Sequence, residues 1–219
     1  VTFSSTGTVT TFGTLNSSNR QNIAGASSST RGLFLGGQSP SSSPGITNTI
    51  DYITLASTGN AVDFGDISEI VQAPSAASSS TRVVRFGGGT PTLVNTIDYV
   101  TTSTLGNALD FGDLTELRWF AAACSNSTRG LSAGNNTATN VIDFITIASV
   151  GNAQDFGDLN GTLSNHSACS SPTRGIFGGN SNRIDYVTIS TTGNASDFGD
   201  FTVNVHNLGA ACSNGHGGL

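Results

Sequence analysis

The amino-acid sequence predicts an all-β protein, a β-propeller of four-stranded blades, on three observations. One block of residues recurs four times along the 219-residue chain. Each copy contains four short apolar or β-branched segments, separated by Gly, Ser, Asn and Pro. No segment places apolar residues at helical spacing, with capping residues, over the ten or so positions that a helix needs. Four strands in a period near 45 to 50 residues are typical of propeller blades.

The repeated block reads Thr-Arg-Gly, a strand that ends in Gly-Gly, then Ile-Asp-Tyr, Thr-Gly-Asn-Ala and Asp-Phe-Gly-Asp. Its arginine recurs at intervals of 51, 47 and 45 residues, at Arg31, Arg82, Arg129 and Arg174. The copies differ in length mainly between Gly-Gly and Ile-Asp, for example over residues 38–47. Because surface loops tolerate length changes best, we predict a loop there.

Each copy is predicted to hold four strands. The first is short and apolar, as in Ala-Ala-Ala-Cys at 121–124, and the second is Gly-Leu-Phe-Leu at 32–35. The third, as at 50–55, is rich in β-branched and aromatic residues. Gly59 and Asn60 both tolerate positive φ, so we expect a tight hairpin turn before a fourth strand that carries Val62 and Phe64.

The two ends of the chain continue the repeat. The first thirteen residues match the second half of a copy, and residues 210–217 match the first half of another. We therefore expect one domain of five blades, the fifth split between the termini, which leaves no exposed sheet edge. The expected division is 1–25 (second half of the split blade and a linker strand), 26–76, 77–123, 124–168, 169–210, and 211–219 (first half of the split blade).

The split copy lacks the portion between Gly-Gly and Ile-Asp. A longer parent chain with more blades is therefore the alternative. The sequence also contains no Met, as expected of a processed form or of part of a longer chain.

Composition argues against several classes of partner. Charged residues make up only 10% of the chain, and the net charge is −6. Nucleic acids and anionic membranes select basic surfaces, so we expect neither as a partner. No apolar run approaches the ~20 residues that cross a bilayer, so we expect no membrane insertion.

A Gly-Gly strand end, an aromatic residue some 25 positions later and a period near 47 together resemble the kelch repeat. More narrowly, the amino-acid sequence of the block is similar to repeats in virion proteins of marine tailed bacteriophages, notably cyanophages. This resemblance covers nearly the whole chain. It implies a kelch-like propeller in a particle-associated, extracellular protein, such as a tail fibre, an appendage or a capsid decoration, and it carries over no catalytic residue.

Twelve of the fourteen acidic residues are aspartates at three repeat positions, and only Glu69 and Glu116 lie elsewhere. A carboxylate repeated four times is not a unique catalytic group. One interpretation is a set of Ca²⁺ sites. The favoured one is structural: each Asp caps a turn or pairs with the repeat arginine. We predict ion pairs between Arg31, Arg82, Arg129, Arg174 and Asp63, Asp110, Asp155, Asp197, with a ring of arginines that grips an anionic glycan as the alternative.

No enzyme is predicted. The segment 130–134 matches the Gly-x-Ser-x-Gly motif of hydrolases, but it lies inside a repeat strand with no helix after it. Cys124, Cys169 and Cys212 occupy equivalent repeat positions, which lie too far apart for a disulfide. We expect them to be small core residues, and we expect no cofactor.

Residues that depart from the repeat are the remaining candidates for recognition. Arg118, Trp119 and Phe120 break the pattern of their copy, and aromatic and Arg side chains are typical interface anchors. They could equally fill the core of one larger blade. The loop at 38–47 is the other place for a partner to bind.

We therefore expect a non-enzymatic structural or binding module of a phage virion, which contacts other virion proteins or a host-surface receptor or glycan. A homo-oligomeric assembly is a further expectation. The alternative is a carbohydrate-binding, lectin-type propeller, with the exposed faces of repeated aromatic residues as platforms. The candidates are Tyr52, Tyr99, Phe144 and Tyr186, although their strand positions suggest core.

Overall fold

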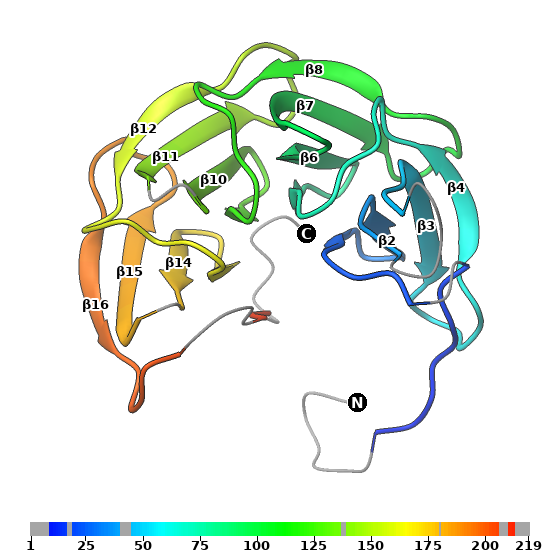
Figure 1. The fold of residues 1–219 in the computed structure, drawn as a ribbon, viewed down its shortest axis with the longest axis horizontal. Helices are drawn as coiled ribbons and strands as arrows, with labels where there is room; N and C mark the ends of the chain where they lie inside the picture. Colours follow the sequence, from blue (N-terminus) through cyan, green and yellow to red (C-terminus); the bar gives the residue numbers. More distant parts are fainter. Residues whose placement is uncertain are drawn as a thin grey trace.

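The computed structural model describes residues 9–16, 19–39, 45–136, 139–179, 181–205 and 210–212. These residues form four antiparallel sheets of four strands, each hydrogen-bonded in chain order. The sheets pack side by side in an arc, consistent with propeller blades, and we call them blades 1 to 4 in chain order (Figure 1). The predicted all-β architecture of repeated four-stranded sheets is confirmed.

The strands have the following bounds. Blade 1 contains β1 (Ala24–Ser27), β2 (Arg31–Leu35), β3 (Thr49–Thr54) and β4 (Val62–Asp66). Blade 2 contains β5 (Ser75–Ser78), β6 (Arg82–Gly89), β7 (Leu93–Thr101) and β8 (Leu109–Asp113). Blade 3 contains β9 (Ala122–Ser125), β10 (Arg129–Asn135), β11 (Thr139–Thr146) and β12 (Gln154–Asp158). Blade 4 contains β13 (Ser167–Ser170), β14 (Arg174–Gly178), β15 (Arg183–Thr188) and β16 (Ser196–Asp200).

The first strand of each blade lies toward the centre of the arc and the fourth lies at its rim (Figure 1). Strands β1, β5, β9 and β13 contact one another in that order. The hydroxyl groups of Ser78, Ser125 and Ser170 each donate a hydrogen bond to a main-chain carbonyl oxygen of the preceding blade, at 2.8, 2.7 and 2.7 Å. Each predicted repeat boundary lies two residues inside a first strand.

The hydrophobic core lies between neighbouring blades. Three clusters of buried apolar side chains span the junctions between blades 1 and 2, 2 and 3, and 3 and 4. The first cluster, for example, contains Leu33 of β2 and Val83 of β6. A single blade therefore cannot bury its apolar face without a neighbour.

The Asp-Phe-Gly-Asp motif forms a β-bulge in the fourth strand of every blade. In blade 1, Ile50 pairs with Gly65 while the adjacent Asp51 pairs with Asp63, so the rim strand carries one extra residue. That residue, Phe64, is buried at the junction with blade 2.

The Gly-Asn pair does not form the expected tight hairpin, because residues 55–61 separate β3 from β4. The pair contacts the preceding blade instead. The Gly106 N–H donates to the Phe64 carbonyl oxygen at 2.8 Å, and the Asn107 side chain accepts a bond from the Asp66 N–H at 3.1 Å. Equivalent bonds join blades 2 and 3, and blades 3 and 4. We call this contact the clasp.

Two motif glycines make the clasp possible. A Cβ on Gly65 would lie 2.5 Å from the carbonyl group of Gly106, and Gly65 has a φ of 143°. Gly112 faces Gly151, and Gly157 faces Gly193, in the same way. The repeated Gly-Asn and Asp-Phe-Gly-Asp motifs therefore form a contact between neighbouring blades rather than a turn within one blade.

The described N-terminal segment makes this clasp with blade 1. The Gly59 N–H donates to the Phe12 carbonyl oxygen at 2.9 Å, and the Ala61 N–H donates to that of Thr14, also at 2.9 Å. The segment thus stands where a fourth strand of a preceding blade would stand, in the opening of the arc between blades 4 and 1 (Figure 1). Residues 1–8 and 213–219, which complete the predicted split blade, lie outside the described residues.

Candidate functional site

The four repeat arginines pack on the repeat aromatic residues. The guanidinium carbons lie 4.8, 4.4, 4.8 and 4.9 Å from the ring centroids of Tyr52, Tyr99, Phe144 and Tyr186. Each ring also meets the Phe of its own Asp-Phe-Gly-Asp motif edge-to-face. One face of each predicted carbohydrate platform is therefore occupied by an arginine.

Three of these arginines also join neighbouring blades. Arg31, Arg82 and Arg129 donate hydrogen bonds, at 2.7, 2.8 and 3.1 Å, to the main-chain carbonyl oxygens of Thr102, Ile147 and Ile189 in the following blade. The structure does not bring the repeat arginines together with Asp63, Asp110, Asp155 and Asp197, so the predicted ion pairs are corrected. The strand register separates them, because Arg31 lies opposite Thr54 whereas Asp63 lies opposite Asp51, and these aspartates are exposed at the rim.

The rim aspartates stabilise the bulge itself. Asp63, Asp155 and Asp197 each accept a hydrogen bond from the N–H of the glycine two residues later, at 3.2, 3.0 and 2.9 Å. This is the turn-capping role that the sequence favoured for them.

A different set of four aspartates, on the third strands, is buried and ion-paired. Asp51, Asp98, Asp143 and Asp185 are almost fully buried. Their partners are arginines outside the repeat position, each from a different place in the fold: Arg20 before β1, Arg85 on β6, Arg118 between β8 and β9, and Arg183 at the start of β15. All eight arginines of the chain therefore have a structural contact.

Three of these carboxylates also hold the preceding blade. Asp98, Asp143 and Asp185 accept hydrogen bonds from both the main chain and the side chain of one residue that follows the preceding fourth strand. The donors are Ser68, Thr115 and Asn160.

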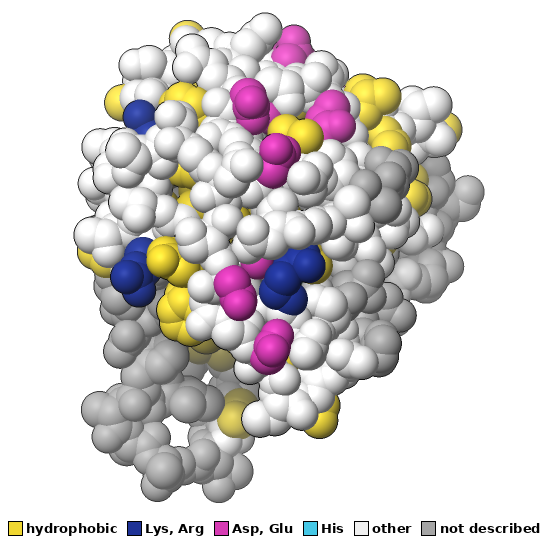
Figure 2. Space-filling view, turned by 90° about the vertical axis from the view of Figure 1, so that its left-hand side faces the viewer, with side chains coloured by type: hydrophobic (Ala, Val, Ile, Leu, Met, Phe, Trp, Pro, Cys, Tyr) yellow, Lys and Arg dark blue, Asp and Glu magenta, His cyan; other side chains and the backbone are white. Residues whose placement is uncertain are grey.

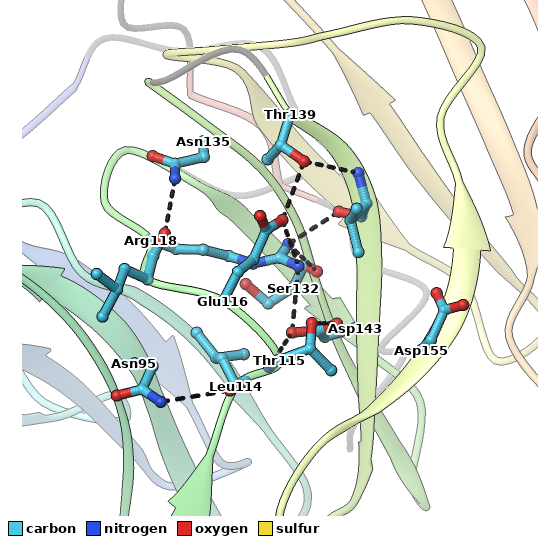
Figure 3. A network of polar contacts seen from close by, with 12 residues as sticks. Asn95, Leu114, Thr115, Glu116, Arg118, Ser132, Asn135, Thr139, Asp143 and Asp155 are labelled. Atoms are coloured by element: carbon cyan, nitrogen blue, oxygen red, sulfur yellow. Dashed lines mark hydrogen bonds and ion pairs between the residues drawn. The ribbon is translucent and has the colours of Figure 1, made fainter.

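Arg118 is buried rather than available to a partner. Its Nη2 lies 3.1 Å from Asp143 and 3.3 Å from Glu116, and its Nη1 donates to the Ser132 and Val141 carbonyl oxygens at 3.0 and 2.8 Å (Figure 3). Burial lowers the pKa of Arg118, and the two carboxylates oppose that shift. The prediction that Arg118 contacts a partner is therefore corrected, because Arg118 is buried and compensates the charge of the buried Asp143.

Trp119 and Phe120 are half-buried and pack edge-to-face, with ring centroids 5.0 Å apart. The Trp119 ring covers Gly89, where a Cβ would lie 2.6 Å from it. The Trp119 carbonyl oxygen accepts a bond from the Asn136 N–H at 3.2 Å. Trp119 therefore fills a junction between blades, whereas Phe120 reaches the centre of the arc.

A cavity of about 150 Å³ lies where the four blades meet, and we call it the axial pocket. Two consecutive residues from every blade line it, directly before the innermost strand. They are Asn22 and Ile23, Ala73 and Pro74, Phe120 and Ala121, and Asn165 and His166. Because each blade contributes equivalent positions, the pocket lies on the axis of the arc.

Among the described residues that line the axial pocket, His166 is the one with a titratable side chain. It is only 6% exposed, and its imidazole lies beside Gly134 and Phe177. Neither ring nitrogen has a hydrogen-bond partner among the described residues. Burial, with a smaller effect of Arg118, lowers the pKa of His166 to about 4.

The cysteines have unequal environments at equivalent positions. Cys124 is buried, with its sulfur against Gly175 of blade 4, and burial raises the pKa of its thiol. Cys169 is half-buried and Cys212 is exposed, and none of the three forms a disulfide. Core placement is thus confirmed for Cys124 only, because blade 4 has no neighbour that covers Cys169 among the described residues.

Blade 4 presents an apolar face that the other blades bury. Phe198 is 51% exposed, whereas its equivalents Phe64, Phe111 and Phe156 are at most 3% exposed. Phe198 and Phe201 line a cavity of about 380 Å³ that also touches Ala210 and Ala211. Figure 2 shows the outer side of the arc that lies at the left in Figure 1, and most of the described surface there is neither charged nor hydrophobic.

In the described part of the chain, no three His, Cys, Asp or Glu side chains are grouped so that they could hold a metal ion. Within those same ranges, no helix is long and apolar enough to cross a membrane. Ser132, in the hydrolase-like motif, lies within β10 and is 1% exposed. Comparison with models of protein families gives no match, and comparison with curated proteins gives none either.

Sequence reasoning missed Arg20, Arg85 and Arg183 as partners of the buried aspartates, and His166 and the two asparagines as pocket residues. A charge count could have found the first group. Four aspartates in the middle of predicted core strands need four cations, and four arginines remain outside the repeat position. No local signal marks the pocket residues, because they meet only when the blades assemble.

Proposed function

We propose that this chain is a non-enzymatic structural and binding module of a phage virion, in which a rigid propeller supports assembly or attachment to a host surface. The observation that carries the proposal is the use of the repeated polar groups. The repeat arginines, the buried aspartates, the clasp asparagines and the inner-strand serines all bond across blade junctions. Chemistry repeated in this way supports a scaffold. The virion role comes from the resemblance of the repeat to phage virion proteins.

The experiment is to raise antibodies against the recombinant chain and to label purified particles of the phage that encodes it. We expect label on intact particles. Label confined to infected-cell lysate, with none on particles, contradicts the virion role. An assay of the chain against glycan and ester substrates addresses the non-enzymatic part, and turnover by the purified chain overturns it.

We further propose that the ring closes with five blades, and that the N-terminal segment forms the rim of the fifth. The clasp of Phe12 and Thr14 with blade 1 supports this closure on one side. The exposed Phe198 of blade 4 supports it on the other side, since its equivalents are covered by a following blade. In the sequence, Gly7 is the repeat equivalent of the clasp glycines Gly59, Gly106, Gly151 and Gly193.

Closure is tested with Gly199→Ala, compared with Gly112→Ala, in the full chain and in a chain that lacks residues 1–8. A Cβ on Gly199 would meet no described atom within 4 Å, whereas a Cβ on Gly112 would lie 2.6 Å from Gly151. If the ring closes, Gly199→Ala destabilises the full chain as much as Gly112→Ala, and the deletion removes that effect for Gly199 alone. A mild effect of Gly199→Ala in both chains contradicts closure by this segment.

The second candidate function is a carbohydrate-binding, lectin-type propeller. The repeated platforms do not favour it, since arginines cover them. The axial pocket does, because its lining combines an aromatic ring, two carboxamides and an imidazole. Screening the protein on an array of neutral and charged glycans tests this function as a whole.

A further inference from the structure

Two departures from the repeat meet in the axial pocket. Phe120 stands where the other blades have Asn22, Ala73 and Asn165. His166 stands where they have Ile23, Pro74 and Ala121. Blades 1 and 2 form their junction with neither an aromatic ring nor an imidazole at these positions, so the scaffold does not require them. The two side chains come from neighbouring blades and line one cavity.

The imidazole of His166 has hydrogen-bonding capacity that the described protein atoms do not use. Both ring nitrogens are buried, and neither has a partner among the described residues. A neutral imidazole offers one donor and one acceptor, and burial keeps the pKa of His166 near 4, so the ring is neutral at pH 7. These nitrogens have almost no exposed surface, so the ring senses the pocket lining from behind and a ligand in the pocket does not contact them.

The backbone that lines the pocket is held in an uncommon conformation. Asn22, Ala73, Phe120 and Asn165 have φ angles of 53, 50, 52 and 50°. Such angles are unusual for alanine and phenylalanine, and they persist only where the surroundings impose them. Main-chain bonds from Ala73 to Asn22 and from Phe120 to Ala73, at 2.8 and 3.0 Å, hold three of the four loops together. The lining is therefore preorganised.

The lining selects against charged ligands. Among the described residues that form it, none has a charged side chain. The nearby Arg118 is fully buried and already paired with Asp143 and Glu116. An ion would lose its hydration without gaining a counter-charge, which is unfavourable. The cavity volume of about 150 Å³ corresponds to about five water molecules, so it accommodates one edge of a sugar ring with its hydroxyl groups rather than the whole unit.

We propose that the axial pocket binds one neutral pyranose unit at the end of a glycan. The Phe120 ring packs on the C–H face of the sugar, and the Asn22 and Asn165 carboxamides bond to its hydroxyl groups, while the buried His166 imidazole lies behind the lining. This inference rests on the carbohydrate-binding candidate function and gives that function a site.

The experiment follows the ¹⁵N signals of the His166 imidazole while glucose, galactose or mannose is added to the full chain, with glucuronic acid and glucosamine as charged probes. We expect at least one neutral sugar to shift the signals in a saturable way, and the charged sugars to bind at least tenfold more weakly. If no neutral sugar shifts them, or if a charged sugar binds more tightly, the proposal is overturned.

Two variants assign the site. Phe120→Gly removes the ring and suits the positive φ, so the fold is retained. Its matched control is Asn19→Gly, which makes a substitution by glycine at another positive φ outside the pocket lining. We expect Phe120→Gly to weaken sugar binding at least tenfold and Asn19→Gly to leave it unchanged. If Phe120→Gly binds neutral glycans on the array as the parent does, the lectin function stands and the axial site is overturned.

Discussion

At the residue scale, the arginines divide into two groups of four with different tasks. The first group recurs with the repeat and stacks on aromatic rings at the blade junctions. The second group reaches the buried aspartates from four unrelated positions. Arginine suits both tasks, because its planar guanidinium stacks on rings and forms several directed bonds to oxygen. The aspartate is thus constant while the source of its cation varies from blade to blade.

Arg118 allows this pairing to be tested. It occupies the position of Val71 and Leu163 in the other junctions, so Arg118→Leu restores an apolar side chain but leaves Asp143 buried without its cation. We expect a loss of about 3–5 kcal/mol in the free energy of unfolding at pH 7. Urea denaturation measures it, and Arg118→Leu with Asp143→Asn should recover much of the loss.

The pH dependence of Arg118→Leu has a definite sign. Without its cation, the negative charge of the buried Asp143 carboxylate is uncompensated, so the ionised carboxylate destabilises the fold. The deficit relative to the parent should therefore shrink as the pH falls from 8 to 5. A deficit that is the same at both pH values argues that lost packing, not charge, is responsible.

His166 gives a second prediction on acid stability. Its folded-state pKa is about 4, below the ordinary value of 6.5, so the unfolded chain takes up a proton first as the pH falls. The contribution of the neutral imidazole to the free energy of unfolding is fully present above about pH 6.5. It falls by roughly 3 kcal/mol as the pH decreases to 4. In urea titrations at pH 7 and 4.5, His166→Leu should lose less stability on acidification than the parent. An equal loss in the two proteins would falsify the buried, neutral state of this imidazole.

At the element scale, equivalent strands differ in the contacts that they make with neighbouring blades. The inner strands are joined by serine hydroxyl groups that donate to the preceding strand, and the clasp joins the rims. Both contacts are directional along the chain. A donor group at a given repeat position is therefore expected to stabilise the fold only where the preceding blade supplies its acceptor.

Ser125 and Ser27 show this difference as a matched pair. The Ser125 hydroxyl donates to the Ser78 carbonyl oxygen at 2.7 Å and accepts a bond from the Ser78 N–H at 3.3 Å. Ser27, at the same repeat position, contributes its carbonyl oxygen to the relay. We expect Ser125→Ala to lower the free energy of unfolding by about 1–3 kcal/mol, and Ser27→Ala to change it much less. Thermal unfolding of the two variants decides, and equal losses would contradict a directional relay.

At the scale of the whole molecule, stability resides in the junctions. The buried clusters and the polar contacts both lie between blades, so the blades are expected to unfold together. The most exposed large aromatic side chain of the described blades is Phe198, at the end of the arc that has no described neighbour. The open end of the arc and the axial pocket are thus places where the described surface differs from the repeated pattern of the blades.

Calcium is not expected to contribute to this stability. Three rim aspartates accept bonds from main-chain N–H groups, and the buried aspartates accept bonds from arginine. The melting temperature should therefore be the same in excess calcium and in excess EDTA. A rise of several degrees with calcium, lost on chelation, would restore the metal interpretation of the repeated aspartates.

Much of the fold could be predicted from local sequence patterns. Strand identity followed from apolar and β-branched segments between glycine-rich turns, and four-stranded units followed from the period. The site could not be predicted in the same way. Trp119 and Phe120 are adjacent in sequence, yet one fills a junction and the other lines the axial pocket.

The sequence by itself determined the repeated unit, because turn residues and strand patterns act over a few neighbouring positions. Only the tertiary structure decided which groups meet. Arg31 bonds to a carbonyl oxygen 71 residues away, and Gly106 bonds to Phe64 of another blade. Such contacts depend on how the blades pack around the axis, and the packing buries one aspartate of each repeat while it leaves another at the rim. The same packing brings Phe120 and His166 into one pocket, which no local pattern encodes.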